Sequence, residues 1–67
     1  MEVFIERITK YIKESNLTKA QFAQMVGVSE YRLNSWLNRK SKPRGNHLYE
    51  ICVKTGLSSD YLLGMKD

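Results

Sequence analysis

Hydrophobic residues recur along the chain at the spacing of amphipathic helices, and no useful length of sequence alternates with the period of two typical of a strand. In the first stretch, Phe4, Ile8, Tyr11 and Ile12 lie at i, i+4, i+7 and i+8, on one face of a helix over about residues 2–15. Similar stretches follow, separated by short polar or glycine-containing breaks. The pattern therefore predicts an all-α protein.

The second and third predicted helices meet at Gly27-Val28-Ser29. Thr18 followed by Gln21 has the form of a capping box, so we expect a helix to start at Thr18. Gly27 ends this helix, because glycine adopts the left-handed conformation of a helix C-terminus without strain, and Ser29 caps the next helix. Two short helices joined by so tight a corner are typical of a helix-turn-helix. The residues expected to pack inward are Phe22, Ala23, Val26, Val28, Leu33, Trp36 and Leu37.

The remaining chain predicts a loop and two more helices. Residues 38–45 hold the only proline and four basic residues, which indicates a loop within one domain. Asn46 is expected to cap a fourth helix that ends at Gly56, and Ser58 or Ser59 to start a short fifth helix. The inward residues of the fourth helix are expected to be Leu48, Ile51 and Cys52, and the fifth carries Tyr61, Leu62 and Leu63. The prediction is a compact five-helix bundle forming one domain over residues 1–67.

Composition argues against several functional classes. A chain of 67 residues buries only about 60% of its unfolded surface, which leaves little room for a deep substrate pocket. A single cysteine, Cys52, excludes an internal disulfide, and His47 has no second ligand nearby for a metal. There is no paired carboxylate, Cys-His pair or glycine-rich phosphate loop, no signal-peptide pattern, and no apolar run near the about 20 residues of a membrane span. We expect a cytoplasmic protein that is not an enzyme and needs no cofactor.

Positive charge is concentrated in the middle of the sequence. The net charge is +4, yet residues 17–46 hold six basic residues against Glu30 alone, a balance of +5 that leaves −1 for the rest. Such a concentration is typical of a surface that binds a polyanion, with a solvated basic loop as the alternative.

From Leu17 to Gly64 the chain resembles, without gaps, the phage repressor and Cro-like helix-turn-helix proteins, also called the XRE family. LTKAQFAQMVGVSEYRLNSWLNRKSKPRG is similar to the family's paired helices and the loop that follows, and HLYEICVKTGLSSDYLLG to its fourth and fifth helices. The resemblance implies a lambda-repressor-like DNA-binding fold. It further implies a sequence-specific transcription regulator, a repressor of phage or mobile-element type.

The second of the paired helices, about residues 29–38, would lie in the major groove. By resemblance, Glu30, Tyr31 and Ser35 stand where family members contact base edges, and Asn34 shares their face. Asparagine pairs with adenine, glutamate accepts from cytosine, and tyrosine meets the thymine methyl group. Two alternatives stay open, since Glu30 also stabilises the first turn of a helix and Tyr31 also covers the second helix.

Phosphate contacts are expected from a second, mostly basic set, because they dominate affinity for DNA. The set is Lys19, Arg32, Asn38, Arg39, Lys40, Lys42 and Arg44. Lys19 stands at a helix N-terminus, where its charge adds to nearby free backbone amides. For any single basic residue of the set, solvation without DNA contact is the alternative.

The chain departs from the family pattern at four positions. Lys19 replaces a usual glutamine. Arg39 stands where the family often has glycine, so we expect Asn38 to take the left-handed turn conformation. Gly45 and Thr55 each replace a usual apolar residue, which is expected to loosen the start of the fourth helix and the packing near its end.

The expected partner is double-stranded operator DNA with palindromic half-sites, bound by a homodimer. The apolar region of Tyr61, Leu62, Leu63 and Met65 is the expected dimer surface. An antitoxin-like protein-interaction module with the same fold is the alternative. Chain beyond the DNA-binding unit would favour that alternative, and only three residues follow Gly64.

Overall fold

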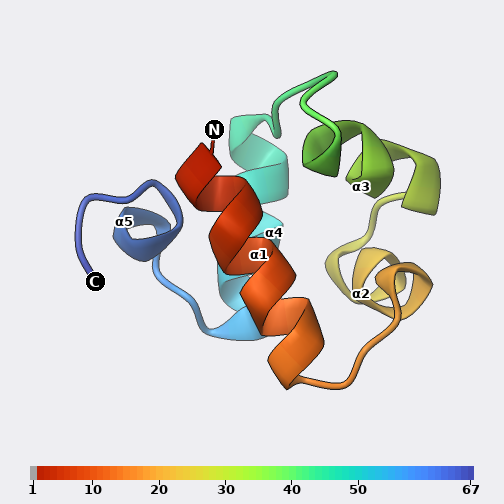
Figure 1. Cartoon of the computed structure of the whole chain (residues 1–67), viewed down its shortest axis with the longest axis horizontal. Coiled ribbons are helices and arrows are strands. Elements are labelled where there is room, and N and C mark those ends of the chain that lie inside the picture. The colour runs from red at the N-terminus through yellow and green to blue at the C-terminus, as the bar shows by residue number, and fades with distance from the viewer. Residues whose placement is uncertain (1) are drawn as a thin grey trace.

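The computed structural model describes residues 2–67, which form five helices and no strand. They are α1 (Glu2–Glu14), α2 (Lys19–Val26), α3 (Glu30–Leu37), α4 (Gly45–Thr55) and α5 (Ser59–Leu62). In Figure 1, α1 crosses the middle of the molecule in front of α4, with α2 and α3 on one side and α5 on the other. Helix α2 packs against α3 and α4, and α5 packs against α1 and α4. The predicted all-α architecture is confirmed.

All five helices contribute to one hydrophobic core, formed by Phe4, Ile8, Ile12, Phe22, Ala23, Val26, Leu33, Trp36, Ile51 and Leu62. At its centre the Phe4 and Trp36 rings meet edge to face, 6.2 Å apart, which ties α1 to α3. Trp36 is only 1% exposed, so it is a core residue rather than a surface for stacking. Full burial of its partner Phe4, 2% exposed, contributes about 1.5–3 kcal/mol.

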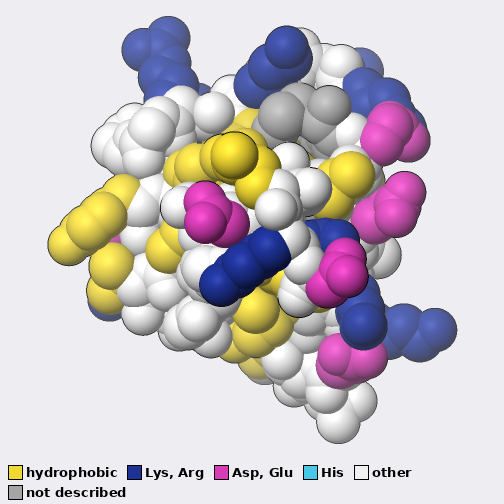
Figure 2. All heavy atoms as spheres, turned by 90° about the vertical axis from the view of Figure 1, so that its left-hand side faces the viewer, with side chains coloured by type: hydrophobic (Ala, Val, Ile, Leu, Met, Phe, Trp, Pro, Cys, Tyr) yellow, Lys and Arg dark blue, Asp and Glu magenta, His cyan; other side chains and the backbone are white. Residues whose placement is uncertain are grey.

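Several apolar residues lie at the margin of this core. Four residues expected to face inward are only half-buried and pack against its edge: Val28, Leu37, Leu48 and Cys52. Leu62 is fully buried and therefore unavailable as a dimer surface, whereas Leu63 and Met65 are 48% and 73% exposed. Figure 2 shows hydrophobic side chains gathered on the side of the molecule that α5 forms.

The corner between α2 and α3 forms as the sequence predicts. The Gln21 amide donates to the Thr18 hydroxyl (3.0 Å) and the Thr18 amide to the Gln21 side chain (2.9 Å), which completes the capping box. Gly27 has a φ of 81°, and the amide of Val28 returns to the carbonyl of Ala23 (2.9 Å). This is the hydrogen bond of a Schellman motif, and it turns the chain toward Ser29. The Ser29 hydroxyl then caps α3 by accepting from the Arg32 amide (3.0 Å).

Helix α4 begins earlier than expected. Its first residue is Gly45 and its N-cap is Arg44, so the prediction of an Asn46 cap is wrong. Arg44 has the extended conformation usual for an N-cap (φ −83°, ψ 170°). Its carbonyl accepts from the Leu48 amide (2.9 Å), while its own amide donates to Nδ1 of His47 (3.4 Å).

Thr55 is accommodated within its own helix end. Its hydroxyl donates to the carbonyl of Ile51 (2.6 Å) and accepts from the amide of Leu57 (3.1 Å). The polar group at this half-buried position is therefore satisfied locally, and Leu57 packs at the edge of the core beside it.

Candidate nucleic-acid interface

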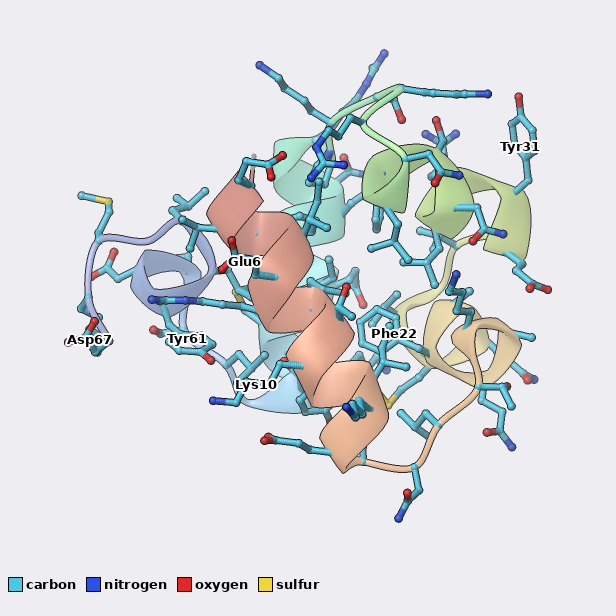
Figure 3. The ribbon with its side chains drawn as sticks, viewed as in Figure 1. Glu6, Lys10, Phe22, Tyr31, Tyr61 and Asp67 are labelled. Atoms are coloured by element: carbon cyan, nitrogen blue, oxygen red, sulfur yellow. The ribbon has the colours of Figure 1, made fainter. Side chains whose placement is uncertain are left out.

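Helix α3 presents one polar face opposite the buried side chains of Leu33 and Trp36. Glu30, Asn34 and Asn38 lie on it at i, i+4 and i+8, with Tyr31 and Ser35 forming the neighbouring row. Tyr31 is 85% exposed and extends from α3 away from the core (Figure 3). Its possible role as cover over α2 is therefore not supported by the structure.

The face is not uniformly exposed. Glu30 and Tyr31 are exposed, but Asn34 and Ser35 are half-buried. At Ser35 the loop after α3 folds back over the helix, and the hydroxyl of Ser41 lies 2.8 Å from that of Ser35. Ser41 was not expected at this surface, because its proximity to Ser35 depends on the path of the loop and leaves no signal in residue spacing.

Two shallow hollows flank Ser35 on this face. One is lined by Ser29, Tyr31, Arg32, Ser35 and Ser41. The other is lined by Tyr31, Asn34, Ser35, Asn38 and Lys40. Three of the four expected base-contact residues, Tyr31, Asn34 and Ser35, thus line these two hollows, together with Arg32 in the first and Lys40 in the second.

The turn that ends α3 is made by Arg39 and not by Asn38. Asn38 keeps a near-helical conformation (φ −95°, ψ 11°), whereas Arg39 has a φ of 62°, so the expectation for Asn38 is wrong. The Arg39 amide donates to the Trp36 carbonyl (3.1 Å) and the Lys40 amide to that of Ser35 (2.9 Å). These are the two bonds of a Schellman motif, which requires the left-handed conformation one residue beyond the C-cap.

Arg39 also makes a long-range contact that the sequence did not suggest. Its Nε and Nη2 donate to the two carboxylate oxygens of Glu2, with an Nη2–Oε2 distance of 2.6 Å. The hydrogen bonds from Arg39 hold the pKa of the Glu2 carboxyl below its ordinary value, and the same contact raises the pKa of the Arg39 guanidinium. Of the expected phosphate ligands, Arg39 is therefore already engaged by an acid of the same chain.

The other expected phosphate ligands are exposed and lie on three segments. Lys19 is the first residue of α2, directly after the Thr18 cap, and Arg32 is on α3. Asn38, Lys40, Lys42 and Arg44 lie between α3 and α4. Five of these ligands are basic, namely Lys19, Arg32, Lys40, Lys42 and Arg44. Within residues 2–67, none of these five side chains lies within ion-pair distance of an acid. Each cation is thus available to an external anion.

Other kinds of site are not found in the described part of the chain. No group of three or more His, Cys, Asp or Glu residues there has an arrangement that could hold a metal ion. None of the helices in residues 2–67 is long and apolar enough to cross a membrane.

The paired helices, their glycine corner and the polar outer face of the second helix define a helix-turn-helix protein. The family model described as Helix-turn-helix matches residues 8–62, and the chain belongs to this family. Among curated proteins, it is 33% identical over 58 residues to Repressor protein C2 of Salmonella phage P22. The aligned segment makes up 87% of this chain but only 27% of that repressor. No solved structure gives a significant match. The expected resemblance to phage repressor-like helix-turn-helix proteins is confirmed.

Proposed function

We propose that the chain is a sequence-specific DNA-binding transcription regulator of repressor type, and that α3 is its recognition helix in the major groove. The observation that carries the proposal is the polar face of α3, which is bordered by unpaired cations from α2 and from the loop after α3. Similarity to a phage repressor supports it. We further propose that residues 1–67 form a single DNA-binding domain without catalytic activity, and that it acts in the cytoplasm.

Within this proposal the contacts divide into two classes. Glu30, Tyr31, Asn34 and Ser35 would contact base edges, since they surround the two hollows or precede them on the same helix. Lys19, Arg32, Asn38, Lys40, Lys42 and Arg44 would contact phosphates. Glu30 also satisfies the positive end of α3, and this stabilising role does not depend on DNA.

We also propose that two copies bind palindromic half-sites about one helical turn apart. The surface suggested for pairing consists of Leu63, Met65 and Val3, which are all exposed. Val3 belongs to this surface because its side-chain atoms lie 3.1–3.3 Å from the position a Cβ at Gly64 would occupy. A second copy is favoured as occupant because symmetric pairing doubles the base contacts of a short recognition helix.

The experiment that tests the function is titration of the chain with a random duplex at several salt concentrations, followed by selection of preferred sites from a random pool. We expect affinity to fall linearly with salt on logarithmic axes, and the selected sites to be palindromic. Footprints over one asymmetric site would contradict the dimer, and binding that is independent of salt would contradict DNA as the partner. Leu63→Glu should weaken binding to paired half-sites more than to a single half-site.

A further inference from the structure

Two features of Arg39 stand out together. It adopts a φ of 62°, a conformation that residues with a Cβ rarely take, and its side chain spans to the first residue of α1. Glycine would satisfy the turn without strain. Unlike a glycine, the arginine at this position has a side chain that reaches Glu2.

The contact with Glu2 is bidentate, the strongest geometry available to an arginine and a carboxylate. Glu2 also stabilises α1 itself, because a negative charge in the first turn of a helix interacts favourably with the helix dipole. Two residues further into α1, Phe4 packs against Trp36 of α3 in the core. The N-terminal end of α1 thus makes two contacts. Phe4 packs against α3 in the core, and Glu2 binds the loop after α3 at the surface.

The loop is held at several points around this contact. Glu2, Arg39, Ser41 and Lys42 line one shallow hollow, so the ion pair is adjacent to a cation proposed to bind phosphate. The amides of Lys40 and Ser41 both donate to the carbonyl of Ser35, at 2.9 and 3.3 Å. The loop path is consequently fixed against α3 by its backbone and against α1 by the Arg39 side chain.

We propose that Glu2 and Arg39 form a clasp that holds the loop of residues 38–44 in its DNA-binding arrangement, and that Arg39 is a positioning residue which does not itself bind phosphate. The inference rests on the proposed function, since it assigns the loop's phosphate contacts to Lys40, Lys42 and Arg44. Glu2 lies outside residues 8–62, the segment that the family model matches, so the clasp joins that segment to the first turn of α1.

The test is the double variant Glu2→Gln/Arg39→Gln, which removes one charge of each sign and so leaves the net charge at +4. The matched control is Glu6→Gln/Lys10→Gln, which makes the same exchange at two exposed positions further along α1 (Figure 3). Each protein is titrated with random duplex DNA at several salt concentrations. Amide hydrogen exchange of Lys40 and Ser41 is measured separately without DNA.

We expect the clasp variant to bind about two- to fivefold more weakly than the parent, the range for an exposed ion pair, with an unchanged salt slope. Its Lys40 and Ser41 amides should exchange faster, and the control should match the parent in every measurement.

A salt slope shallower by about 0.9 would overturn the inference by showing that Arg39 binds a phosphate. Tighter binding would overturn it by showing that Glu2 holds Arg39 away from DNA, and unchanged exchange would show that no clasp exists. If the parent itself fails to bind DNA, the proposed function fails, while the exchange measurement still decides whether Glu2 and Arg39 restrain the loop.

Discussion

The guanidinium of Arg7 on α1 stacks on the ring of Tyr61 on α5, 4.2 Å from the ring centroid. Nη1 of the same guanidinium donates to the carbonyl of Tyr61 (2.5 Å) and to that of Lys66 (2.6 Å). One side chain therefore fixes both the end of the short helix α5 and the segment after it. The exposed residues Leu63 and Met65, proposed for dimerisation, lie between the two carbonyls that Arg7 holds.

Arg7→Lys should weaken cooperative binding to paired half-sites while leaving binding to a single half-site nearly unchanged. Lysine keeps the charge but lacks the planar fork that stacks on Tyr61 and donates to two carbonyls. The measurement is a pair of titrations, with one duplex carrying two half-sites and another carrying one. Lys10→Arg, an exchange of the same two residue types at an exposed position of α1, is the control. Equal losses on both duplexes would show that Arg7 does not act through α5.

Gly27→Val should destabilise the protein by more than about 1 kcal/mol. A Cβ at Gly27 would meet no atom within 4 Å, so the cost arises from the left-handed backbone, at φ 81°, and not from a clash. Gly45 offers a control because it also has free space around its Cβ position but is helical, so Gly45→Ala should stabilise by about 0.4–1 kcal/mol. Urea unfolding of both variants checks the pair. A Gly27→Val protein as stable as the parent would contradict the helix-turn-helix corner.

Lys42→Ala should weaken binding to preferred and random duplexes equally and reduce the salt slope by about 0.9. Lys42 is exposed in the loop after α3, where it is proposed to bind a phosphate that carries no sequence information. The titrations are run on both duplexes at several salt concentrations. A loss confined to the preferred duplex would assign Lys42 to base recognition.

Asn34→Gln should cost the preferred duplex about 1–3 kcal/mol and leave random binding nearly unchanged. Asn34 is half-buried at the edge of a hollow with Tyr31 and Ser35, so a longer amide displaces the proposed base contact. Ser15→Thr, on the exposed segment after α1, provides a background substitution remote from α3. If Asn34→Gln weakens both duplexes alike, α3 is not the recognition helix.

Glu2→Gln should destabilise the protein at neutral pH, and the difference from the parent should vanish in acid. The pKa of Glu2 is lowered in the folded state by its hydrogen bonds with Arg39. Its contribution is therefore fully present above the ordinary glutamate pKa of about 4.3 and is lost as the pH falls through the lower folded-state value. Urea unfolding of the two proteins across this range is the measurement. A difference that persists in acid would mean that the carboxylate charge is not what stabilises the contact.

Those parts of the fold that depend on local chemistry could be predicted from the sequence. Thr18 and Gln21 cap each other within one turn, Gly27 supplies its own backbone freedom, and Ser29 caps the helix that directly follows it. Most of the inward residues followed from helical spacing, although Val28, Leu37, Leu48 and Cys52 are less buried than expected and lie at the edge of the core. The polar face of α3 followed from the same spacing.

Features that depend on the path of the chain could not be predicted. The start of α4 depends on where the loop leaves its extended conformation, at Arg44, and the capping preference of Asn46 does not reveal this. The position of the left-handed residue after α3 is set by where the helix ends. It falls on Arg39, although residues with a Cβ rarely adopt a positive φ. The partners Glu2 and Ser41 come from outside α3, so no periodicity of the recognition helix could indicate them.

The burial of Trp36 has an optical consequence. It is the chain's only tryptophan, and it lies on the inner side of α3 with the Phe4 and His47 ring centroids 6.2 and 5.4 Å away. Tryptophan emission therefore originates in the core directly beneath the surface proposed to contact DNA. It will shift to longer wavelength when α3 separates from the core and water reaches the indole, and it will keep its wavelength when DNA docks on the opposite face. The molecule thus contains its own fluorescent probe, which distinguishes displacement of the recognition helix from occupation of its outer surface.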